Sequence, residues 1–416
     1  MTEPDVVVVG AGAAGIGAGM ALRAARIPFV ILEAQNRIGG RAFTDRASLP
    51  GHWDQGCQWF HSADINPLVP WAELLGSEVE RQDRTEKSLV WNGGWLDPSV
   101  VTTTRRKAIR AAFDAVYAAA AADRDQPIAE VLPDGGTYAR FIRHILQLLG
   151  CDDPEAVSAK GYGQYLDTGV NWVVTSGLGD LFERMAAGLP IRTGVPVTAL
   201  RERSGGVAVD TAGGTIRAKA AIVTASTGVL NAGAITFGPG PANDLLDHIA
   251  DVPCGSYEKV AIALDQLPEG ISDELFCWID PGGDATAADF QIVGGAHPKL
   301  IAHVAGSVAR DLMAAGEAAA VGYAIDSLRD AFGADISARV LGTAVTGWQS
   351  NPFFRGGYSY SRPGAADRRL AMIGAETGPI AFAGEAFSPR SQATAHGAWQ
   401  SGQDVAARVI RSAGLG

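Results

Sequence analysis

Gly10, Gly12 and Gly15 have a spacing that leaves backbone N–H groups open to an anion. They form a GxGxxG motif after an apolar run, and Glu33 follows 18 residues beyond Gly15. In such motifs one glycine permits a tight turn, one leaves room for a pyrophosphate, and one lets a helix pack on a strand. The helix N-terminus attracts phosphate oxygens, and a carboxylate such as Glu33 accepts hydrogen bonds from ribose hydroxyls. The motif predicts a dinucleotide site, with a structural glycine turn as the weaker alternative.

A second group of residues suited to phosphate follows directly. The run Arg37-Ile-Gly-Gly-Arg41 places two adjacent glycines beside Arg41, whose guanidinium can neutralise a phosphate. A solvated arginine after a turn is the alternative interpretation. The glycine motif does not distinguish NAD from FAD, and this second run of residues helps to do so.

Lys259 lies among apolar residues in a strand that the sequence predicts over residues 257–264. Because side chains alternate across a strand, Lys259 shares one face with Ala261 and Ala263. The opposite face is apolar and carries Val260, Ile262 and Leu264. A lysine beside two alanines points either to solvent or into a cavity, and the strand pattern alone favours an exposed lysine.

The elements that must position these residues begin with a β-α-β unit. Residues 6–9 are a run of valines, typical of a parallel strand buried on both faces. An alanine-rich helix is expected over residues 13–25, and a second strand over residues 29–32. Later strands are expected at residues 196–200, 207–210, 221–224, 300–304, 340–346 and 380–383, and helices at 104–123, 138–149, 314–332 and 396–412.

Composition excludes several classes of protein. The 416 residues suggest two or three domains, and 34 basic against 45 acidic residues argue against a nucleic-acid partner. Four scattered cysteines without CxxC spacing argue against a zinc site, so we expect no metal. No apolar run reaches the roughly 18 residues that span a bilayer, and the polar N-terminus is unlike a signal peptide. We therefore expect a cytoplasmic protein without a membrane partner, and the oligomeric state stays open.

Taken together, these motifs resemble those of the flavin-containing amine oxidases, a family that includes monoamine oxidases, polyamine oxidases and lysine-specific histone demethylases. The resemblance extends over both ends of the chain and several points between them. It rests on residues 6–15, 32–41, 53–59, 196–197, 255–260, 348–360, 382–385, 393–398 and 401–402.

The resemblance implies a two-lobed α/β fold. An FAD-binding doubly wound (Rossmann-like) domain would be assembled from residues 1–60, 175–250 and 370–416. A mixed α+β substrate-binding domain would be formed by residues 61–174 and 251–369.

The same resemblance implies roles for individual residues. Lys259 resembles the catalytic lysine that holds a water against flavin N5. Glu385 would hydrogen-bond the ribityl or pyrophosphate region, and the helix near Ala395 would point its N-terminus at the flavin, where it stabilises negative charge. The residues expected to bind FAD are Gly10, Gly12, Ala14, Gly15, Glu33, Ala34, Gly40, Arg41, Gly56, Gln58, Trp59, Val197, Trp348, Gly384, Glu385, Ala393, Thr394 and Ala395.

The chain also departs from the family pattern. Tyr358 stands where some members attach FAD through a cysteine, so FAD is expected to be non-covalent. Ser359 and Thr394 occupy the positions of two tyrosines that flank the flavin in monoamine oxidases, and the local motifs are closer to the polyamine oxidase branch. His396 is either a base or a neutral polar contact. The substrate cavity is expected to be lined by residues among Trp59, His61, Tyr162, Tyr165, Trp172, Tyr358 and Thr394.

The predicted function is FAD-dependent oxidation of a small-molecule amine to an imine, which is hydrolysed to a carbonyl compound, with O2 reduced to H2O2. Histone demethylation is disfavoured because helical chromatin-facing insertions have no counterpart here. Two alternatives stay open: a related desaturase or dehydrogenase acting on a C–C bond, resembling protoporphyrinogen oxidase or carotene desaturases, and a non-catalytic FAD-binding protein. The sequence does not identify the amine.

Overall fold

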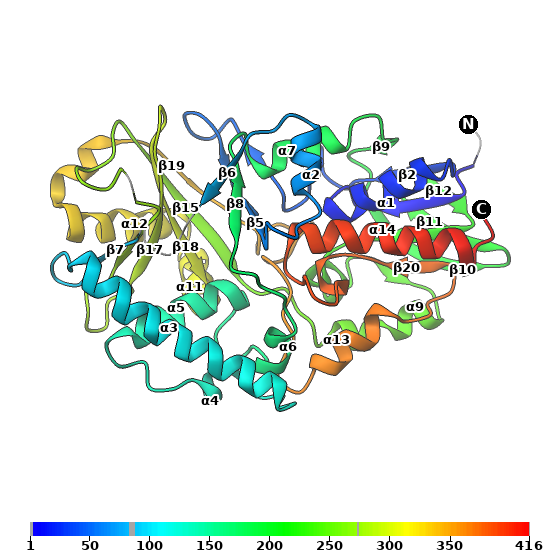
Figure 1. Ribbon diagram of the computed structural model, residues 1–416. Coiled ribbons are helices and arrows are strands. Elements are labelled where there is room, and N and C mark those ends of the chain that lie inside the picture. The colour runs from blue at the N-terminus through cyan, green and yellow to red at the C-terminus, as the bar shows by residue number, and fades with distance from the viewer. Residues whose placement is uncertain (1–2, 83–87, 273, 416) are drawn as a thin grey trace.

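A computed structural model describes residues 3–82, 88–272 and 274–415. The chain forms two lobes, which lie side by side in Figure 1. The first lobe, which holds both termini, is built on a five-stranded parallel sheet with the order β20-β13-β1-β2-β9. These strands are β1 (Val6–Val9), β2 (Phe29–Leu32), β9 (Ile191–Arg192), β13 (Ala220–Val223) and β20 (Ile380–Phe382).

The valines of β1 explain why this sheet is central to the first lobe. All four are buried, and they alternate between two hydrophobic clusters, one on each face of the sheet. On one face lie α1 (Ala13–Ala24) and α14 (Ala395–Ser412), side by side. A Cβ at Gly402 would stand 1.9 Å from the Ala14 carbonyl oxygen, so a glycine is required for this close helix contact. The other face packs on a sheet of β10 (Val197–Arg203), β11 (Gly206–Thr211), β12 (Gly214–Ala218) and β14 (Thr236–Phe237).

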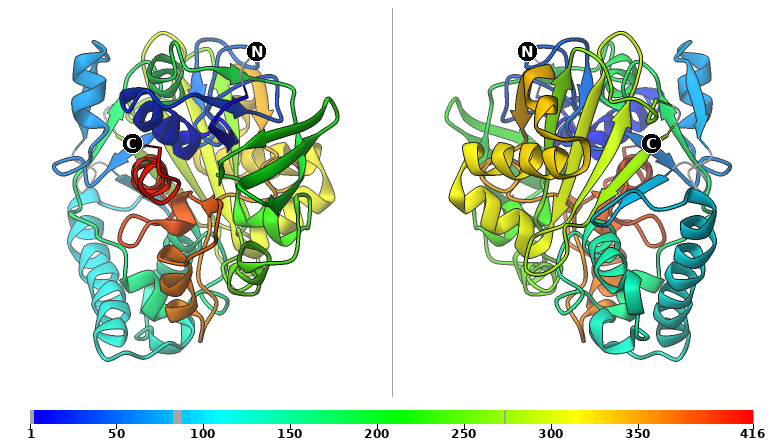
Figure 2. Two further views of the ribbon diagram at one scale, coloured as in Figure 1. Left: turned by 90° about the vertical axis from the view of Figure 1, so that its right-hand side faces the viewer. Right: turned by 90° about the vertical axis from the view of Figure 1, so that its left-hand side faces the viewer.

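The second lobe is built on a six-stranded sheet with the order β19-β15-β18-β17-β16-β7. One face is covered by α12 (Glu317–Phe332), which packs on the apolar face of β15 that carries Val260 and Ile262. A layer of helices lies below the sheet in Figure 1, and Figure 2 shows it from the end of the lobe. The strands are β7 (Ser88–Trp91), β15 (Tyr257–Leu264), β16 (Phe276–Ile279), β17 (Ala288–Val293), β18 (Lys299–Ala305) and β19 (Val340–Val345), and the helices of the layer are α3 (Pro98–Ala121), α4 (Ile128–Val131), α5 (Ala139–Gly150) and α6 (Ala159–Gly163).

Smaller elements join the two lobes. A three-stranded sheet of order β5-β8-β6 lies between them in Figure 1, and a two-stranded ribbon pairs β3 with β4. Their bounds are β3 (Thr44–Asp45), β4 (Trp53–Asp54), β5 (Trp59–His61), β6 (Val79–Gln82) and β8 (Asn171–Val174); the remaining helices are α2 (Val69–Leu74), α7 (Leu178–Met185), α8 (Thr227–Asn231), α9 (Pro241–Asp244), α10 (Leu246–Ile249), α11 (Gly306–Ala315) and α13 (Ala366–Ile373).

The two-lobed α/β architecture confirms the predicted fold class. One predicted helix is wrong in detail: residues 314–332 belong to two helices, because Gly316 adopts a φ of +96° between α11 and α12. The helix predicted from residue 104 begins at Pro98, where the Asp97 side chain accepts a hydrogen bond from the N–H of Ser99.

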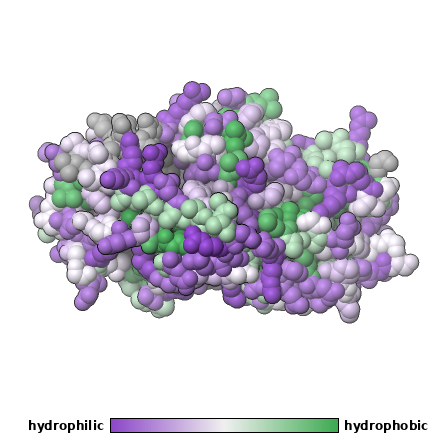
Figure 3. Space-filling model, turned by 60° about the horizontal axis from the view of Figure 1, so that its bottom comes forward, coloured by the Kyte–Doolittle hydropathy of each residue, from purple (hydrophilic) through white to green (hydrophobic). Residues whose placement is uncertain are grey.

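The outer surface is mixed in character. On the face drawn in Figure 3, hydrophilic side chains surround smaller apolar areas. In the ranges that the structure describes, no helix is both long enough and apolar enough to cross a bilayer.

Candidate active site

A cavity of about 860 Å³ is lined by residues of both lobes. Its wall includes the glycine loop that follows β1 in the first lobe, and it also includes residues of α3 and α5 in the second lobe. This volume lies within the range of about 300–1,000 Å³ that is common for ligand sites. The cavity therefore connects the predicted nucleotide loop with the helical layer of the second lobe.

The glycine loop has the geometry that phosphate binding requires. Gly10 adopts a φ of +100°, and a Cβ at Gly15 would stand 1.9 Å from the Gly10 carbonyl oxygen. Gly12 and Gly40 line the cavity, so backbone is exposed to it there. No side chain of a described residue caps the start of α1, which leaves the first N–H groups of that helix available to an anion.

Glu33 directly follows β2 and lies beside this loop, where the sequence predicts it. Its Oε2 accepts a hydrogen bond from the Ala11 N–H over 2.7 Å, and its Oε1 accepts from the Gln35 N–H over 2.8 Å. These bonds fix the buried carboxylate on the cavity wall, next to Ala34 and Val197.

Arg41 and Glu385 form an ion pair at the middle of the cavity wall. Arg41 Nη1 lies 3.2 Å from Glu385 Oε1 and also donates to the Gly357 carbonyl. Burial lowers the pKa of Arg41, but Glu385, together with Cys254 and Cys151, outweighs that effect and holds the pKa above its usual value. Glu385 also accepts hydrogen bonds from the N–H and hydroxyl of Ser359 and from the N–H of Ala393. The carboxylate thus ties three segments of the chain together.

Lys259 is buried, with 2% of its surface exposed, so the exposed-lysine interpretation is wrong. Its Nζ donates to the carbonyls of Asp54 and Gly56, each over 2.8 Å, and to Gln58 Oε1 over 2.6 Å. Burial lowers its pKa to about 8, although electrostatic interactions with Asp54 and Cys57 oppose the shift. The ammonium has three protons, and all of them are used in these three hydrogen bonds. Lys259 can therefore contact a water only if it shares one of these protons or becomes neutral.

Two polar residues extend from Lys259 across the sheet. Lys259 on β15 pairs with His303 on β18, and His303 pairs with Asp289 on β17. All three line the cavity, as directly opposed residues of an antiparallel sheet share a face. Tyr257 also lines it, and its hydroxyl lies 2.6 Å from His303 Nδ1.

Trp348 is held in the cavity wall from two sides. Its ring Nε1 donates to the Gln55 carbonyl over 3.2 Å, and its backbone N–H donates to Glu258 Oε2 over 3.0 Å. Gly56 lies beside it, and a Cβ there would stand 1.7 Å from the Arg41 carbonyl oxygen. Glu258 points away from Lys259 into the opposite face of β15, and burial raises its pKa.

The N-terminus of α14 also borders the cavity. Thr394 caps this helix by accepting a hydrogen bond from the Gly397 N–H over 3.0 Å. Ala393 adopts a φ of +62°, and Ala393, Thr394 and Ala395 all line the cavity, as does Gly384.

The predicted substrate residues are mostly placed together. The cavity lining includes Trp59, His61, Tyr162, Tyr165, Tyr358 and Thr394. The prediction for Trp172 is wrong: it pairs with Phe60 across β5 and β8 and packs against the same core, whereas Trp59 and His61 on either side of Phe60 face the cavity. The Trp172 ring instead stacks under Arg81, 4.7 Å from its Cζ.

His396 is a neutral polar contact. It lies outside the cavity lining in the described chain, and its Nδ1 lies 3.1 Å from the side-chain nitrogen of Asn66. Burial, followed by the nearby His61, lowers the His396 pKa to about 4. At neutral pH it therefore carries no charge and interacts with Asn66.

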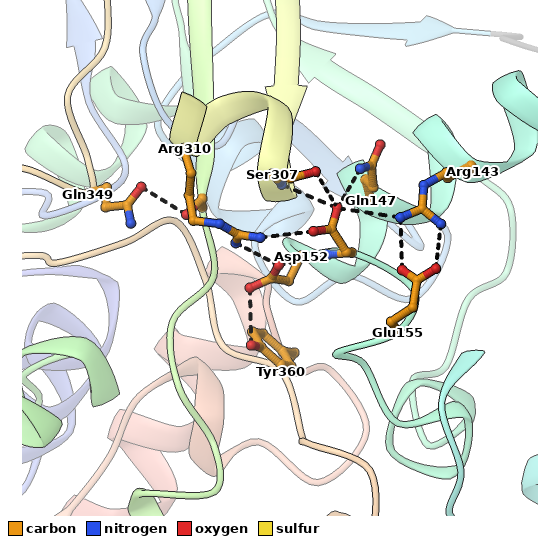
Figure 4. A network of polar contacts seen from close by, with 10 residues as sticks. Arg143, Gln147, Asp152, Glu155, Ser307, Arg310, Gln349 and Tyr360 are labelled. Atoms are coloured by element: carbon orange, nitrogen blue, oxygen red, sulfur yellow. Dashed lines mark hydrogen bonds and ion pairs between the residues drawn. The ribbon is translucent and has the colours of Figure 1, made fainter. Parts of the chain in front are cut away.

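A polar network holds the segment that carries Tyr358. The Tyr358 N–H donates to the Cys151 sulfur over 3.3 Å, and its hydroxyl donates to a carbonyl of α5. Figure 4 shows the adjoining network, in which Asp152 accepts from Tyr360 over 3.1 Å and from Arg310 over 2.7 Å. Arg310 also pairs with Asp153 over 2.9 Å. The network joins α5, α11 and the Tyr358 segment, and so fixes one wall of the cavity.

Several cavity residues were missed by the sequence reasoning. Asp289 and His303 are polar residues in mostly apolar strands, which is a signal that the alternation of side chains along each strand could have revealed. Arg105 lies on α3 without any surrounding motif. In the part of the chain that the structure describes, no group of His, Cys, Asp and Glu side chains is arranged to hold a metal ion.

The residues present fit a dinucleotide cofactor. The uncapped start of α1 can bind phosphate oxygens, and Glu33 provides a carboxylate in a fixed position. Gly12, Gly40 and Gly384 have no side chain, so their backbone borders the cavity directly. An adenine dinucleotide with a second ring system would extend from this loop toward Lys259 and Trp348.

Comparisons with known proteins agree with this assignment. Residues 8–71 match the NAD(P)-binding Rossmann-like domain, and residues 136–410 match the family described as flavin containing amine oxidoreductase. Polyamine oxidase 2 of Arabidopsis thaliana is 27% identical over 99% of this chain and 90% of its own length. Lysine-specific histone demethylase 2 of Homo sapiens is 24% identical over 97% of this chain but 53% of its own length.

Solved structures share the fold. Cyclohexylamine oxidase from Brevibacterium oxydans IH-35A superposes with a TM-score of 0.82 at 22% identity, and the match covers 99% of both chains. Putrescine oxidase bound to putrescine superposes with a TM-score of 0.80 at 18% identity and covers 99% of both chains. The family match spans well over half of the chain, and the chain therefore belongs to the flavin containing amine oxidoreductases, as an enzyme with FAD as its cofactor.

Proposed function

We propose that this enzyme oxidises a small-molecule amine to an imine, which water hydrolyses to a carbonyl compound and ammonia or a smaller amine, while O2 is reduced to H2O2. The observation that carries the proposal is a buried lysine, Lys259, in a cavity that joins the dinucleotide loop to an aromatic chamber. When bound, the flavin supplies the two-electron oxidation of the carbon–nitrogen bond, and the protein supplies binding and orientation.

Lys259 favours the reactive form of the substrate. Its charge lies against the cavity, and a nearby like charge disfavours protonation of an amine. An amine entering between Trp59 and Tyr358 would therefore lose its proton more readily than in water. The low pKa of Lys259 also lets this residue exchange a proton near neutral pH.

The cofactor roles follow the positions of the described residues. Gly10, Gly12, Ala14 and Gly15 would present the start of α1 to the pyrophosphate, and Glu33 would accept from the ribose. Arg41 and Glu385 would hold the central part of the cofactor, and the cofactor would be bound non-covalently. Ala34, Gly40, Gly56, Gln58, Val197, Trp348, Gly384, Ala393, Thr394 and Ala395 would complete its surroundings. We also retain the division into a cofactor domain (1–60, 175–250, 370–416) and a substrate domain (61–174, 251–369).

A panel of amines with peroxide detection tests the proposal on the purified yellow protein. We expect peroxide with at least one class of amine, loss of the signal on adding catalase, and a strong decrease in Lys259→Met. Lys107→Met is the matched control, because Lys107 is exposed on α3. Carbonyl product should appear in proportion to peroxide.

The result that overturns the proposal is bleaching of the flavin by C–C bond substrates but by no amine, which would identify a desaturase. A protein that reduces under light and returns in air, yet reacts with neither class, would be a non-catalytic flavoprotein. The polyamine oxidase similarity makes polyamines the first members of the panel.

A further inference from the structure

The floor of the cavity extends well beyond Lys259. Lys259, His303 and Asp289 are cross-strand partners on three neighbouring strands. Strands in a sheet lie about 4.8 Å apart, so the backbone of Asp289 lies roughly 10 Å from that of Lys259. The far end of the cavity can therefore contact a substrate group that is remote from the reacting amine.

Arg105 is the buried cationic residue at this far end, beside the exposed Arg106. It lies on α3, lines the cavity, and has 7% of its surface exposed. Its Cζ stands 4.9 Å from the centre of the Phe141 ring, a distance typical of a cation–π contact. Phe141 also lines the cavity, so the guanidinium is packed against a fixed apolar wall.

The guanidinium of Arg105 has no protein acceptor among the described residues. Its Nη1 is fully buried without a hydrogen-bond partner. The other deeply buried arginine on the cavity wall, Arg369, donates to the Ser388 and Pro389 carbonyls and to Gln164. Burial lowers the pKa of Arg105, and the charge of Asp289 partly opposes that shift from beyond ion-pair distance. A buried cation without a hydrogen-bonding partner is costly, and a guanidinium is shaped to bind a carboxylate through two parallel bonds.

We propose that Arg105 binds a carboxylate at the end of the substrate remote from the amine, so that the substrate class is an ω-amino acid. This inference rests on the proposed amine oxidation and adds the recognition of the second functional group. A diamine would instead bring a second ammonium to Arg105, where like charges repel. Asp289 taken alone would favour the diamine, because its carboxylate attracts an ammonium. Matched substrates distinguish an ω-amino acid from a diamine.

The experiment compares three amines. ε-Aminocaproate and pentylamine share a chain of five carbons next to the amine and differ by the carboxylate, and hexamethylenediamine places its second nitrogen where ε-aminocaproate has a carboxylate oxygen. In the parent enzyme we expect the highest kcat/KM for ε-aminocaproate. Arg105→Gln should lower kcat/KM for ε-aminocaproate by about tenfold to a hundredfold, the loss of one charge-assisted contact, and leave pentylamine within about twofold. Arg105→Lys should retain part of the preference. Arg110→Gln, an exposed arginine on the same helix, is the control and should change none of the three.

A binding measurement separates this inference from the proposed function. Caproate has the carboxylate but no amine, and it should raise the Tm of the parent holoenzyme and of Arg110→Gln, but not that of Arg105→Gln. If no amine is oxidised while caproate still binds through Arg105, the proposed amine oxidation is wrong and the proposed carboxylate site is supported. A preference for hexamethylenediamine that Arg105→Gln leaves unchanged, together with no Tm shift from caproate, would overturn the subsite.

Discussion

Lys259 Nζ lies 2.6 Å from Gln58 Oε1, and the same nitrogen donates to the carbonyls of Asp54 and Gly56. The three side-chain hydrogen bonds of this residue in the second lobe's sheet therefore all go to a short segment that precedes it by about two hundred positions. The segment from Asp54 to Gln58 also borders Trp348 and the cavity. Lys259 thus fixes the local backbone beside the cofactor and carries a charge there.

We predict that Lys259→Met retains FAD but slows turnover by about tenfold or more, a typical loss for a group that moves or positions a proton. Methionine roughly keeps the length of the side chain and removes the charge. Stopped-flow measurement of amine oxidation and of air reoxidation would show which half-reaction is affected. Lys107→Met, an exposed substitution, should leave both rates within about twofold of the parent. Equal behaviour of the two variants would remove Lys259 from the chemistry.

Lys259 also predicts a dependence of stability on pH. Its pKa is about 8 in the folded protein and about 10.4 when unfolded, so between these values the unfolded chain binds more protons. The free energy of unfolding contributed by this residue should therefore rise as pH increases through that window, by roughly 3 kcal/mol in total. Urea unfolding of the parent and of Lys259→Met across the window measures the difference. A constant difference between the two proteins would contradict the lowered pKa.

We predict that Glu33→Ala and Arg41→Ala weaken FAD retention by about ten- to a hundredfold, the loss of one charge-assisted contact of roughly 1.5–3 kcal/mol. Flavin that stays bound should react at close to the parent rate. Arg41→Ala should also lower the Tm, because Glu385 then loses its buried cation. Fluorescence titration of the apoprotein with FAD measures the affinity. Unchanged affinity in both variants would contradict the assignment of this unit to FAD.

The nucleotide lobe could be predicted because its signals are local. The β1–α1–β2 unit depends on consecutive valines, three spaced glycines and one carboxylate, all within a short stretch. Lys259 shows the limit of this reasoning. The alternation of side chains along the strand correctly predicted that Lys259 shares a face with Ala261 and Ala263. It could not predict that the residues from Asp54 to Gln58, which are distant in the sequence, cover that face.

The substrate end was harder to predict because its residues come from separate segments. Arg105 is on a helix, Asp289 and His303 are on two strands, and none of the three belongs to a sequence motif. Trp172 was assigned to the cavity because it is aromatic, yet its pairing with Phe60 turns it toward the core. Which face a strand residue occupies depends on the register of pairing, and a shift by one position reverses it.

We predict that FAD is released when the protein is precipitated with acid. Tyr358 stands at the position where a tether would need a cysteine, and its side chain is engaged with α5. Cys57 is the cysteine that lines the cavity, but burial and the nearby Asp54 raise its pKa to about 12, which keeps it from the reactive thiolate form. The yellow colour should appear in the supernatant. Colour that stays on the pellet in the parent but not in Cys57→Ser would show a bond to Cys57.

Glu258 positions the segment that carries Trp348 beside the cavity. Glu258 accepts hydrogen bonds from the Trp348 and Gln349 N–H groups, each over 3.0 Å, and from the Thr346 hydroxyl. In Glu258→Gln one of these donors meets an amide NH2 and loses its acceptor, which costs about 1–3 kcal/mol in a buried site. We expect urea unfolding to show that loss, and we expect weaker FAD binding because Trp348 is no longer fixed against the cavity. Glu73→Gln, on the exposed side of α2, is the matched control and should change neither property. A Glu258→Gln protein with parental stability but weakened FAD binding would show that Glu258 acts on the cofactor directly and not through the Trp348 segment.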